Sequence, residues 1–382
     1  MKILVTTGSW NAPLVIMESL ARQGHHVYLL DQDLFCAGFR SKHCKGGILC
    51  PPESSSVSYV AAVVEIVRSG KFDLLIPASD LATASLSASR ERLEPFVSLF
   101  LSSKGSIELA SNKKNTYRFA LEHNIAIPRT FFPETLTDVS EFARDAVFPC
   151  VAKKSRGTAN KGNAYFSDRQ SLLRYYEGLT PTDDWPVIQD FIDGDFYGFL
   201  GIAREGEIVD CLMYTAPADT FASGGTPSYC RSVRDDGFLD TARRIVKALN
   251  WTGAINLDFI RDGEGRFLLL EINPRLSGSL TFAYDLGVDL PSLYLALARG
   301  QEVPSFSGVR YRAGVVFRYV LSSEIIELFQ NKKNALKFFG NFFDPRIRTD
   351  IPWRDPSLLT YRLKHLWWHW QDLAKGAGER VG

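Results

Sequence analysis

The chain has 382 residues, of which 45% are hydrophobic, and 44 basic residues against 43 acidic residues leave a net charge of +1. This length predicts two or three packed subdomains, and the near-neutral charge without a basic block argues against nucleic acid as a main partner. Neither the start, MKILVTTGSW, nor any later segment has the apolar length of a secretory signal or a membrane span. We therefore expect a cytoplasmic protein with no integral membrane segment.

Three predicted strands and two predicted helices alternate along the first 110 residues: strands at 2–7, 26–30 and 72–77, and helices at 12–23 and 57–68. This β-α-β-α-β order predicts a doubly wound parallel sheet. The turn after the first strand reads TTGSWN, and its single glycine does not match the GxGxxG motif of dinucleotide-binding domains. A bound dinucleotide is therefore not expected on this sheet.

The six cysteines form no CxxC pair, but Cys36, Cys44 and Cys50 lie near His43 in the sequence. Their spacing matches no common zinc motif, and free thiols are normal in a reducing cytosol. We expect free thiols, with a zinc site as the alternative.

Helix and strand signals continue through the middle of the chain: a helix starting within 111–120 with Ser111 or Asn112 as its cap, strands at 148–154, 187–194 and within 199–215, and a helix at 239–249. Lys153 ends one of these strands, just before the polar loop 155–163. A lysine in this position can reach phosphate groups, whereas a solvated Lys-Lys pair with Lys154 is the alternative.

The segment 253–279 is the most informative part of the sequence. Two apolar stretches flank the turn Asp-Gly-Glu-Gly at 262–265, which predicts a β-hairpin. With a loop at 263–266, Asp262 pairs with Phe267 and Asp258 lies opposite Glu271. Directly opposed side chains are about 4.5–5.5 Å apart at Cβ.

Strand alternation puts Asn256 and Asp258 on one face of this hairpin, and Glu271 and Asn273 share a face as well. Two close carboxylates repel each other, and a hard cation with oxygen ligands removes that repulsion. Asp258, Glu271 and Asn273 are therefore candidate ligands of magnesium bound with ATP. The alternative is a solvent-facing sheet whose acids pair with arginines.

Three arginines are candidates for binding anions. Arg275 follows Pro274 at the exit of the hairpin and could hold phosphate oxygens bidentately, or form a surface salt bridge instead. Arg231 and Arg234, in the Gly/Ser-rich segment 215–235, could hold a substrate carboxylate or a phosphate, or belong to a surface loop.

Taken together, NLDFI (256–260) and EINPR (271–275) across a short hairpin resemble the ATP-grasp superfamily, in its carboxylate–amine ligase branch similar to carbamoyl phosphate synthetase. SNKKNTYRFALEHNIAIPRT (111–130), FPCVAKKSRGTANKG (148–162) and VIQDFIDGD (187–195) support the resemblance. It implies an α/β and α+β chain with the ATP-grasp fold and four parts: a doubly wound parallel-sheet (pre-ATP-grasp) domain at 1–110, a first lobe with a phosphate-covering lid at 111–187, a second lobe with the hairpin at 188–304, and a C-terminal extension at 305–382.

The resemblance also implies roles for single residues. Lys113 and Lys153 would contact ATP phosphates or the adenine N7 edge, Ser155 and Gly157 belong to the phosphate-covering loop, and Arg275 would act with Lys153 in catalysis. The hinge that reads adenine would be Gln189, Asp190, Phe191 and Ile192, with Asp190 and Ile192 using backbone groups. Three positions depart from the family pattern: Asn112 replaces an aspartate, Gln189 a glutamate, and Phe196 the ribose-binding acid, a role left to Asp195 or Asp193.

The implied reaction uses ATP with Mg²⁺ or Mn²⁺. A small-molecule carboxylate, such as an amino acid, would attack the γ-phosphate to give an acyl phosphate and ADP, and an amine would then displace phosphate. The alternatives are a kinase acting on a non-carboxylate acceptor, a non-catalytic ATP-binding regulatory protein, and an Asp/Glu-metal hydrolase.

The aromatic-rich end of the chain predicts a final helix with one apolar face: Leu359, Leu363, Leu366, Trp370 and Leu373. With Trp367 and Trp368, this helix could pack on the protein's own body, which we favour, on a membrane surface, or along a homodimer seam.

Overall fold

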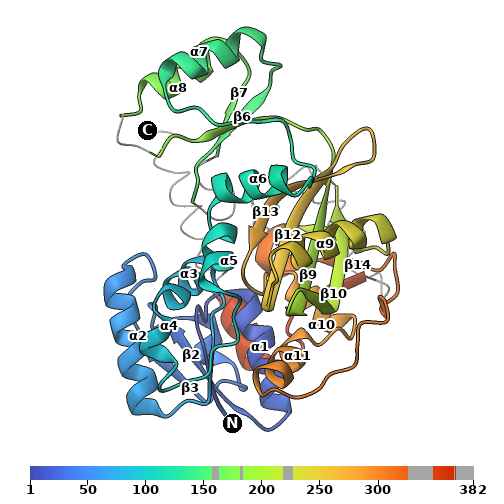
Figure 1. Ribbon diagram of the computed structural model, residues 1–382. Helices are drawn as coiled ribbons and strands as arrows, with labels where there is room; N and C mark the ends of the chain where they lie inside the picture. Colours follow the sequence, from blue (N-terminus) through green and yellow to red (C-terminus); the bar gives the residue numbers. More distant parts are fainter. Residues whose placement is uncertain (157–162, 181–183, 218–226, 326–346, 365, 367–382) are drawn as a thin grey trace, which may run out of the picture.

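The computed structural model describes the chain except residues 157–162, 181–183, 218–226, 326–346, 365 and 367–382. Its strands form three sheets (Figure 1): a four-stranded sheet in the N-terminal domain, a four-stranded sheet in a small lobe, and a seven-stranded sheet between them. In the described part of the chain, no helix has both the length and the apolar character that a membrane crossing requires.

The N-terminal sheet has the order β3-β2-β1-β4, and every pair in it is parallel. Its strands are β1 (Lys2–Val5), β2 (His26–Asp31), β3 (Gly46–Leu49) and β4 (Leu74–Ile76). Its helices are α1 (Asn11–Arg22), α2 (Ser56–Gly70), α3 (Asp80–Ala88), α4 (Arg90–Leu93) and α5 (Lys104–Ala110). Ile3 and Val5 pack on the α1 side, and Leu4 packs on the α2 side, so both faces are covered. The predicted doubly wound parallel sheet is confirmed.

The small lobe contains an antiparallel sheet of order β5-β8-β6-β7. Its elements are β5 (Thr130–Phe131), α7 (Leu136–Asp145), β6 (Cys150–Lys153), β7 (Asn163–Phe166), α8 (Arg169–Glu177) and β8 (Val187–Asp190). The helix α6 (Lys113–Glu122) leads into the lobe and packs on the large sheet through Phe119 and Ala120. Cys150, Ala152 and Ile188 are buried against α7 and α8. Because side chains alternate along a strand, Lys153 and Gln189 point to the opposite face.

The large sheet has the order β13-β12-β9-β10-β11-β14-β15. Its strands are β9 (Asp195–Arg204), β10 (Glu207–Ala216), β11 (Tyr229–Ser232), β12 (Gly253–Arg261), β13 (Phe267–Asn273), β14 (Val316–Arg318) and β15 (Ile347–Thr349). One face packs on α9 (Asp236–Ala248), and the other packs on α1, α10 (Leu280–Asp285) and α11 (Leu290–Ala298). The core on the side of α1, α10 and α11 also contains side chains of the N-terminal sheet, so it joins the large sheet to the N-terminal domain.

The β12–β13 hairpin confirms the central part of the predicted register. Asp258 lies opposite Glu271, as expected, but Arg261 rather than Asp262 pairs with Phe267. The pairing shifts by one residue between Asp258 and Phe259, because β13 has a β-bulge there in which Leu270 is the extra residue. The loop is therefore one residue longer than predicted, and the bulge restores the alignment at the acidic pair.

The C-terminal extension contributes β14 and β15 to the large sheet, and residues 356–364 form a helix. Leu358 is buried in the core that includes α1, but Leu363 is 51% exposed, so the predicted apolar face is wrong at Leu363. Trp367, Trp368, Trp370 and Leu373 lie outside the described residues, and the homodimer stays a prediction.

Candidate functional site

A cavity of about 580 Å³ lies where the small lobe, the large sheet and the N-terminal domain meet. It brings together predicted site residues from distant parts of the sequence: Lys113, Lys153, Phe191, Ile192, Asp258, Glu271, Asn273 and Arg275. No histidine is among the described residues that line it.

The acidic pair lies on the floor of this cavity, on neighbouring strands of the large sheet. Two amides orient Asp258: Asn256 Nδ2 donates to Oδ1 at 2.9 Å, and Asn273 Nδ2 donates to Oδ2 at 3.1 Å. Loss of hydration, and secondly the charge of Glu271, raise the pKa of Asp258 to about 7. The protein itself therefore stabilises the ionised form of Asp258 only weakly, as expected for a carboxylate that binds a cation.

Two lysines of the small lobe face the acids. Lys113 Nζ lies 2.7 Å from Glu271 Oε1, and the Lys113 backbone N–H donates to Ser155 O at 2.8 Å. Asn112 caps α6 through its side chain, as one of the two predicted caps. Lys153 is buried, and loss of hydration lowers its pKa to about 8 although Glu271 opposes the shift. The solvated alternative for Lys153 is therefore wrong.

Arg275 reaches the cavity from the exit of the hairpin. Its Nη2 atom lies 2.9 Å from Asp80 Oδ2 and 3.4 Å from Asn273 Oδ1, and its guanidinium carbon lies 5.7 Å from the centre of the Trp10 ring. Only 12% of the Arg275 side chain is exposed. It is therefore an interior ion pair and not the surface salt bridge of the alternative.

Gln189 occupies the buried side of the predicted adenine hinge. Its Nε2 donates to Thr130 Oγ1 at 2.8 Å, while its Oε1 is buried and has no hydrogen-bond partner among the described residues. A buried acceptor without a donor is costly, and a ligand amino group would satisfy it. Next to it, Arg129 holds the Asp190 carboxylate at 3.0 and 3.2 Å.

Some predicted residues are not brought to the cavity. Asp195 begins β9 opposite Arg261, and Arg231 is exposed on β11, with Nη2 3.3 Å from Tyr229 Oη. Neither lines the cavity in the described part of the chain, and Gln189 and Asp190 of the predicted hinge do not line it either, although Asp193 does. Ser155 is buried beside Lys113, and Gly157 lies outside the described residues.

The zinc alternative concerned Cys36, Cys44, Cys50 and His43. All six cysteines are free. Within the described ranges, no three His, Cys, Asp or Glu side chains are arranged to hold a metal ion. The zinc alternative therefore gains no support. The candidate metal site on the hairpin has two carboxylates, Asp258 and Glu271, and neighbouring amides rather than three acids.

The N-terminal domain contributes to the cavity in a way that the sequence patterns did not reveal. Ser9, Trp10, Asn11 and Ala12 line it, and Asp80 contacts Arg275. These residues follow β1 and β4, the neighbouring strands at which the strand order reverses. Open α/β sheets bind ligands at such a switch point. The predicted doubly wound sheet was therefore the signal that could have pointed to them.

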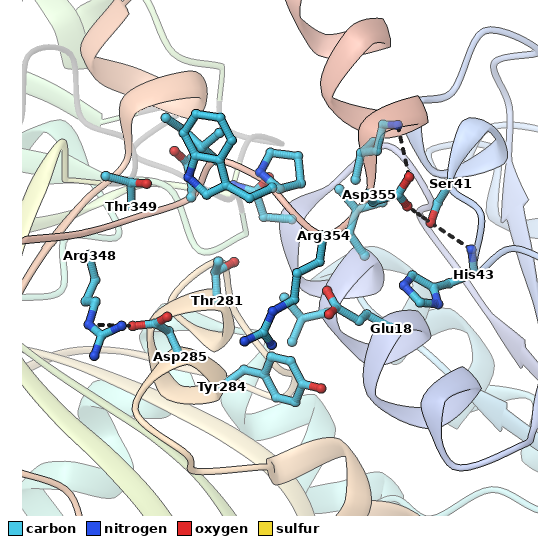
Figure 2. Close-up of a pocket in the computed structure, with 18 of the residues that line it drawn as sticks. Glu18, Ser41, His43, Thr281, Tyr284, Asp285, Arg348, Thr349, Arg354 and Asp355 are labelled. Atoms are coloured by element: carbon cyan, nitrogen blue, oxygen red, sulfur yellow. Dashed lines mark hydrogen bonds and ion pairs between the residues drawn. The ribbon is translucent and has the colours of Figure 1, made fainter. Parts of the chain in front are cut away.

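A second cavity, of about 780 Å³, lies between α1, α10 and residues 347–358 (Figure 2). Its charged side chains are of both signs. Arg348 pairs with Asp285 at 3.6 Å, and Asp355 accepts from Ser41 Oγ at 2.5 Å. Figure 2 shows Arg354 pointing toward Tyr284. Asn11 is shared by both cavities, but the phosphate-binding candidates line only the first.

Known proteins support the fold. A family model described as "ATP-grasp in the biosynthetic pathway with Ter operon" matches residues 209–317. The carbamoyl phosphate synthase large chain of Archaeoglobus fulgidus is 24% identical over 229 residues, which make up 57% of this chain and 21% of that protein. The match thus spans about a fifth of the relative's length.

Two solved structures are similar over most of the chain. A biotin carboxylase from Campylobacter jejuni has a TM-score of 0.70 at 15% identity, covering 82% of this chain and 74% of that one. An L-amino acid ligase from Bacillus licheniformis has a TM-score of 0.60 at 16% identity, covering 78% and 73%. The chain therefore has the predicted ATP-grasp fold, and the matches support an ATP-grasp protein similar to carboxylate–amine ligases.

Proposed function

We propose that this chain is an ATP- and magnesium-dependent carboxylate–amine ligase that forms a carbon–nitrogen bond and releases ADP and phosphate. The observation that carries the proposal is the opposed pair Asp258 and Glu271, which shares one cavity with Lys113, Lys153 and Arg275. A magnesium–triphosphate complex has the complementary charges, since its cation suits the acids and its phosphates suit the three bases.

The metal and the phosphates would be held by opposite walls of the cavity. Asp258, Glu271 and Asn273 would bind Mg²⁺ or Mn²⁺, which neutralises phosphate charge when bound. Lys113 and Lys153 would bind the phosphates from the small lobe.

The rest of the nucleotide would lie along the edge of the small lobe. The hinge at 189–192 would receive adenine, with the unpartnered Gln189 Oε1 accepting from its amino group. Asp190 and Ile192 would contribute backbone groups, and Asp193 or Asp195 would bind the ribose. The loop that includes Ser155 and Gly157 would cover the phosphates, and Arg231 would hold an anionic group of a substrate.

In the proposed reaction, a carboxylate oxygen attacks the γ-phosphorus of ATP, the bond to the β–γ bridging oxygen breaks, and ADP leaves. The amine nitrogen then attacks the carbonyl carbon of the acyl phosphate, phosphate leaves, and the nitrogen loses a proton. The first step needs charge neutralisation and in-line positioning more than acid–base groups. Arg275 and Lys153 would steady the transferring phosphoryl group.

The carboxylate substrate would be an amino acid or a similar small acid. The support is the similarity in fold to an L-amino acid ligase. We also propose a cytoplasmic location, because all six cysteines are free thiols, as expected in a reducing compartment.

The test measures nucleotide products from ATP and magnesium, with and without a pool of amino acids and small carboxylates. ADP and phosphate should appear only with the pool. Glu271→Ala should reduce turnover at least about 100-fold, since charge stabilisation is the main contribution to phosphoryl transfer, while the circular dichroism spectrum stays unchanged. AMP and pyrophosphate as products, or near-normal activity of the variant, would refute the mechanism or the metal assignment respectively.

A further inference from the structure

We infer that Asp80, in the N-terminal domain, is a positioning residue that holds Arg275 ready for the transferring phosphoryl group. The inference rests on the proposed function. Asp80 belongs to α3, and Arg275 follows β13, so this contact joins two structural units at the cavity.

The two charged groups are withdrawn from water together. Asp80 Oδ2 lies 2.9 Å from Arg275 Nη2, and the side chains are 13% and 12% exposed. When one member of such an interior pair is removed, the other is left without compensation. Arg275 therefore depends on Asp80 for its position as well as for its charge balance.

Local structure fixes Asp80. It is the first residue of α3, where the helix dipole stabilises an anion. The preceding Ser79 caps the helix by accepting from the Ala82 N–H at 3.0 Å, and Ser79 also donates to the carboxylate of Glu53. Because Ser79 performs the capping, Asp80 is free to turn to Arg275.

Neither carboxylate oxygen of Asp80 has a partner with hydrogen-bond geometry among the described residues. The 2.9 Å contact with Arg275 is therefore an ion pair rather than an aligned hydrogen bond. Other N–H groups of the guanidinium remain available as donors. Arg275 Nε, in particular, is buried and has no hydrogen-bond partner in the described part of the chain. A phosphate oxygen would satisfy this donor.

Asp80 also keeps Arg275 away from the two carboxylates that are proposed to bind the metal. Arg275 lies within 3.4 Å of Asn273 Oδ1, and it interacts electrostatically with Asp258 and Glu271. Without Asp80, the guanidinium would be drawn to these two carboxylates and would compete with the metal. With Asp80 in place, the arginine is held on the side of the cavity formed by Trp10.

The experiment compares Asp80→Asn with the wild type and with Asp240→Asn, which removes the acid of an exposed pair with Arg243. Affinities for magnesium complexes of ADP and of a non-hydrolysable ATP analogue are measured by calorimetry. We expect the wild type to prefer the analogue by about tenfold, the worth of one charge-assisted contact to the γ-phosphate. Asp80→Asn should lose this preference. Its affinity for ADP should stay within about twofold, because Asp80 lies outside the hinge and the lysines that are proposed to bind ADP.

A second readout separates positioning from stability. In an Arg275→Ala background, Asp80→Asn should not lower the melting temperature further, because it removes a buried charge that has already lost its partner. It should also cause no further loss of the analogue preference, because the positioned group is gone. An unchanged preference in Asp80→Asn, or none in the wild type, would overturn the inference. Absence of any ligase product, with the affinity pattern intact, would refute the proposed function and leave the positioning role standing.

Discussion

At the scale of single residues, acids and bases of the site lie close together: Asp80, Asp258 and Glu271 are near Lys113, Lys153 and Arg275. Each base from the small lobe or the hairpin exit has a nearby acid, and Lys113 already contacts Glu271. A magnesium–triphosphate complex would exchange these internal pairs for new ones, with its cation bound by the acids and its phosphates by the bases. Binding and chemistry therefore depend on the protonation states of a few groups.

The buried amine of Lys153 makes nucleotide affinity depend on pH. Burial lowers its pKa to about 8, so the charged form that attracts phosphates predominates below pH 8 and is lost above it. We expect the dissociation constant of Mg-ATP to rise above pH 8, by up to about tenfold per pH unit if only the charged form binds. Calorimetry between pH 7.5 and 9.5, above the pKa of about 7 of Asp258, would show this.

Lys153→Arg is the control, because a guanidinium keeps its charge over this whole range. Its affinity should be weaker but nearly independent of pH. The same pH profile for wild type and variant would remove Lys153 from the phosphate site.

At the scale of elements, the sequence predicted the acidic hairpin because alternation and turn residues are local signals. Asp258 and Glu271 were expected to be opposite each other, and they are. The β-bulge at Leu270 was not predicted, because a one-residue shift in pairing depends on packing across the sheet and leaves no mark in the hydrophobic pattern. Site residues on strands were thus easier to predict than the exact ends of the strands.

Substitution of Gly198 tests the packing of the strands beneath the acidic pair. It lies on β9 opposite both Tyr214 and Asp258, and a Cβ added there would be 2.6 Å from the Tyr214 hydroxyl oxygen. Because Tyr214 is buried and lines the cavity, Gly198→Ala should cost about 1–3 kcal/mol of unfolding free energy, through overpacking. It should also weaken Mg-ATP binding.

Chemical denaturation and calorimetry would measure the two effects of Gly198→Ala. Gly263→Ala is the matched control, since a Cβ at Gly263 has no atom within 4 Å. Replacing Tyr214 by Ala should relieve most of the strain of Gly198→Ala. An equal loss of stability in both Tyr214 backgrounds would contradict this account.

At the scale of the whole molecule, the cavity takes walls from parts of the chain far apart in the sequence. Trp10 and Asp80 come from the N-terminal domain, and Ser322 comes from the C-terminal extension. No local sequence pattern predicts these contributions, because they depend on how the units pack through the core shared by α1, α10 and the large sheet. The sequence therefore predicted the walls from the small lobe and the hairpin more fully than the walls from the N-terminal domain and the C-terminal extension.

A hydrogen-bond network ties the C-terminal extension to this wall. Asp350 is buried and accepts from the backbone N–H groups of Leu321 and Ser322, each at 3.0 Å, and from the Ser322 hydroxyl. Ser322 in turn accepts from Asn11 Nδ2 at 2.9 Å. Arg362, in the helix at 356–364, donates to the oxygen of Asn11. The network connects the extension, the cavity wall and the first turn of α1.

Removal of Asp350 should loosen this wall and show that the extension shapes the site. Asp350→Ala leaves two backbone donors and a hydroxyl without their acceptor, so it should cost at least about 2 kcal/mol of unfolding free energy. Asp350→Asn keeps one acceptor oxygen and should cost less. Denaturation with urea would measure both, with Glu302→Ala at an exposed position as the control. The network reaches the cavity at Asn11 and Ser322 and contacts neither the adenine hinge nor the lysines, so affinity for Mg-ADP should change little while turnover falls. If Asp350→Ala is as stable and as active as the control, the extension does not hold the wall in place.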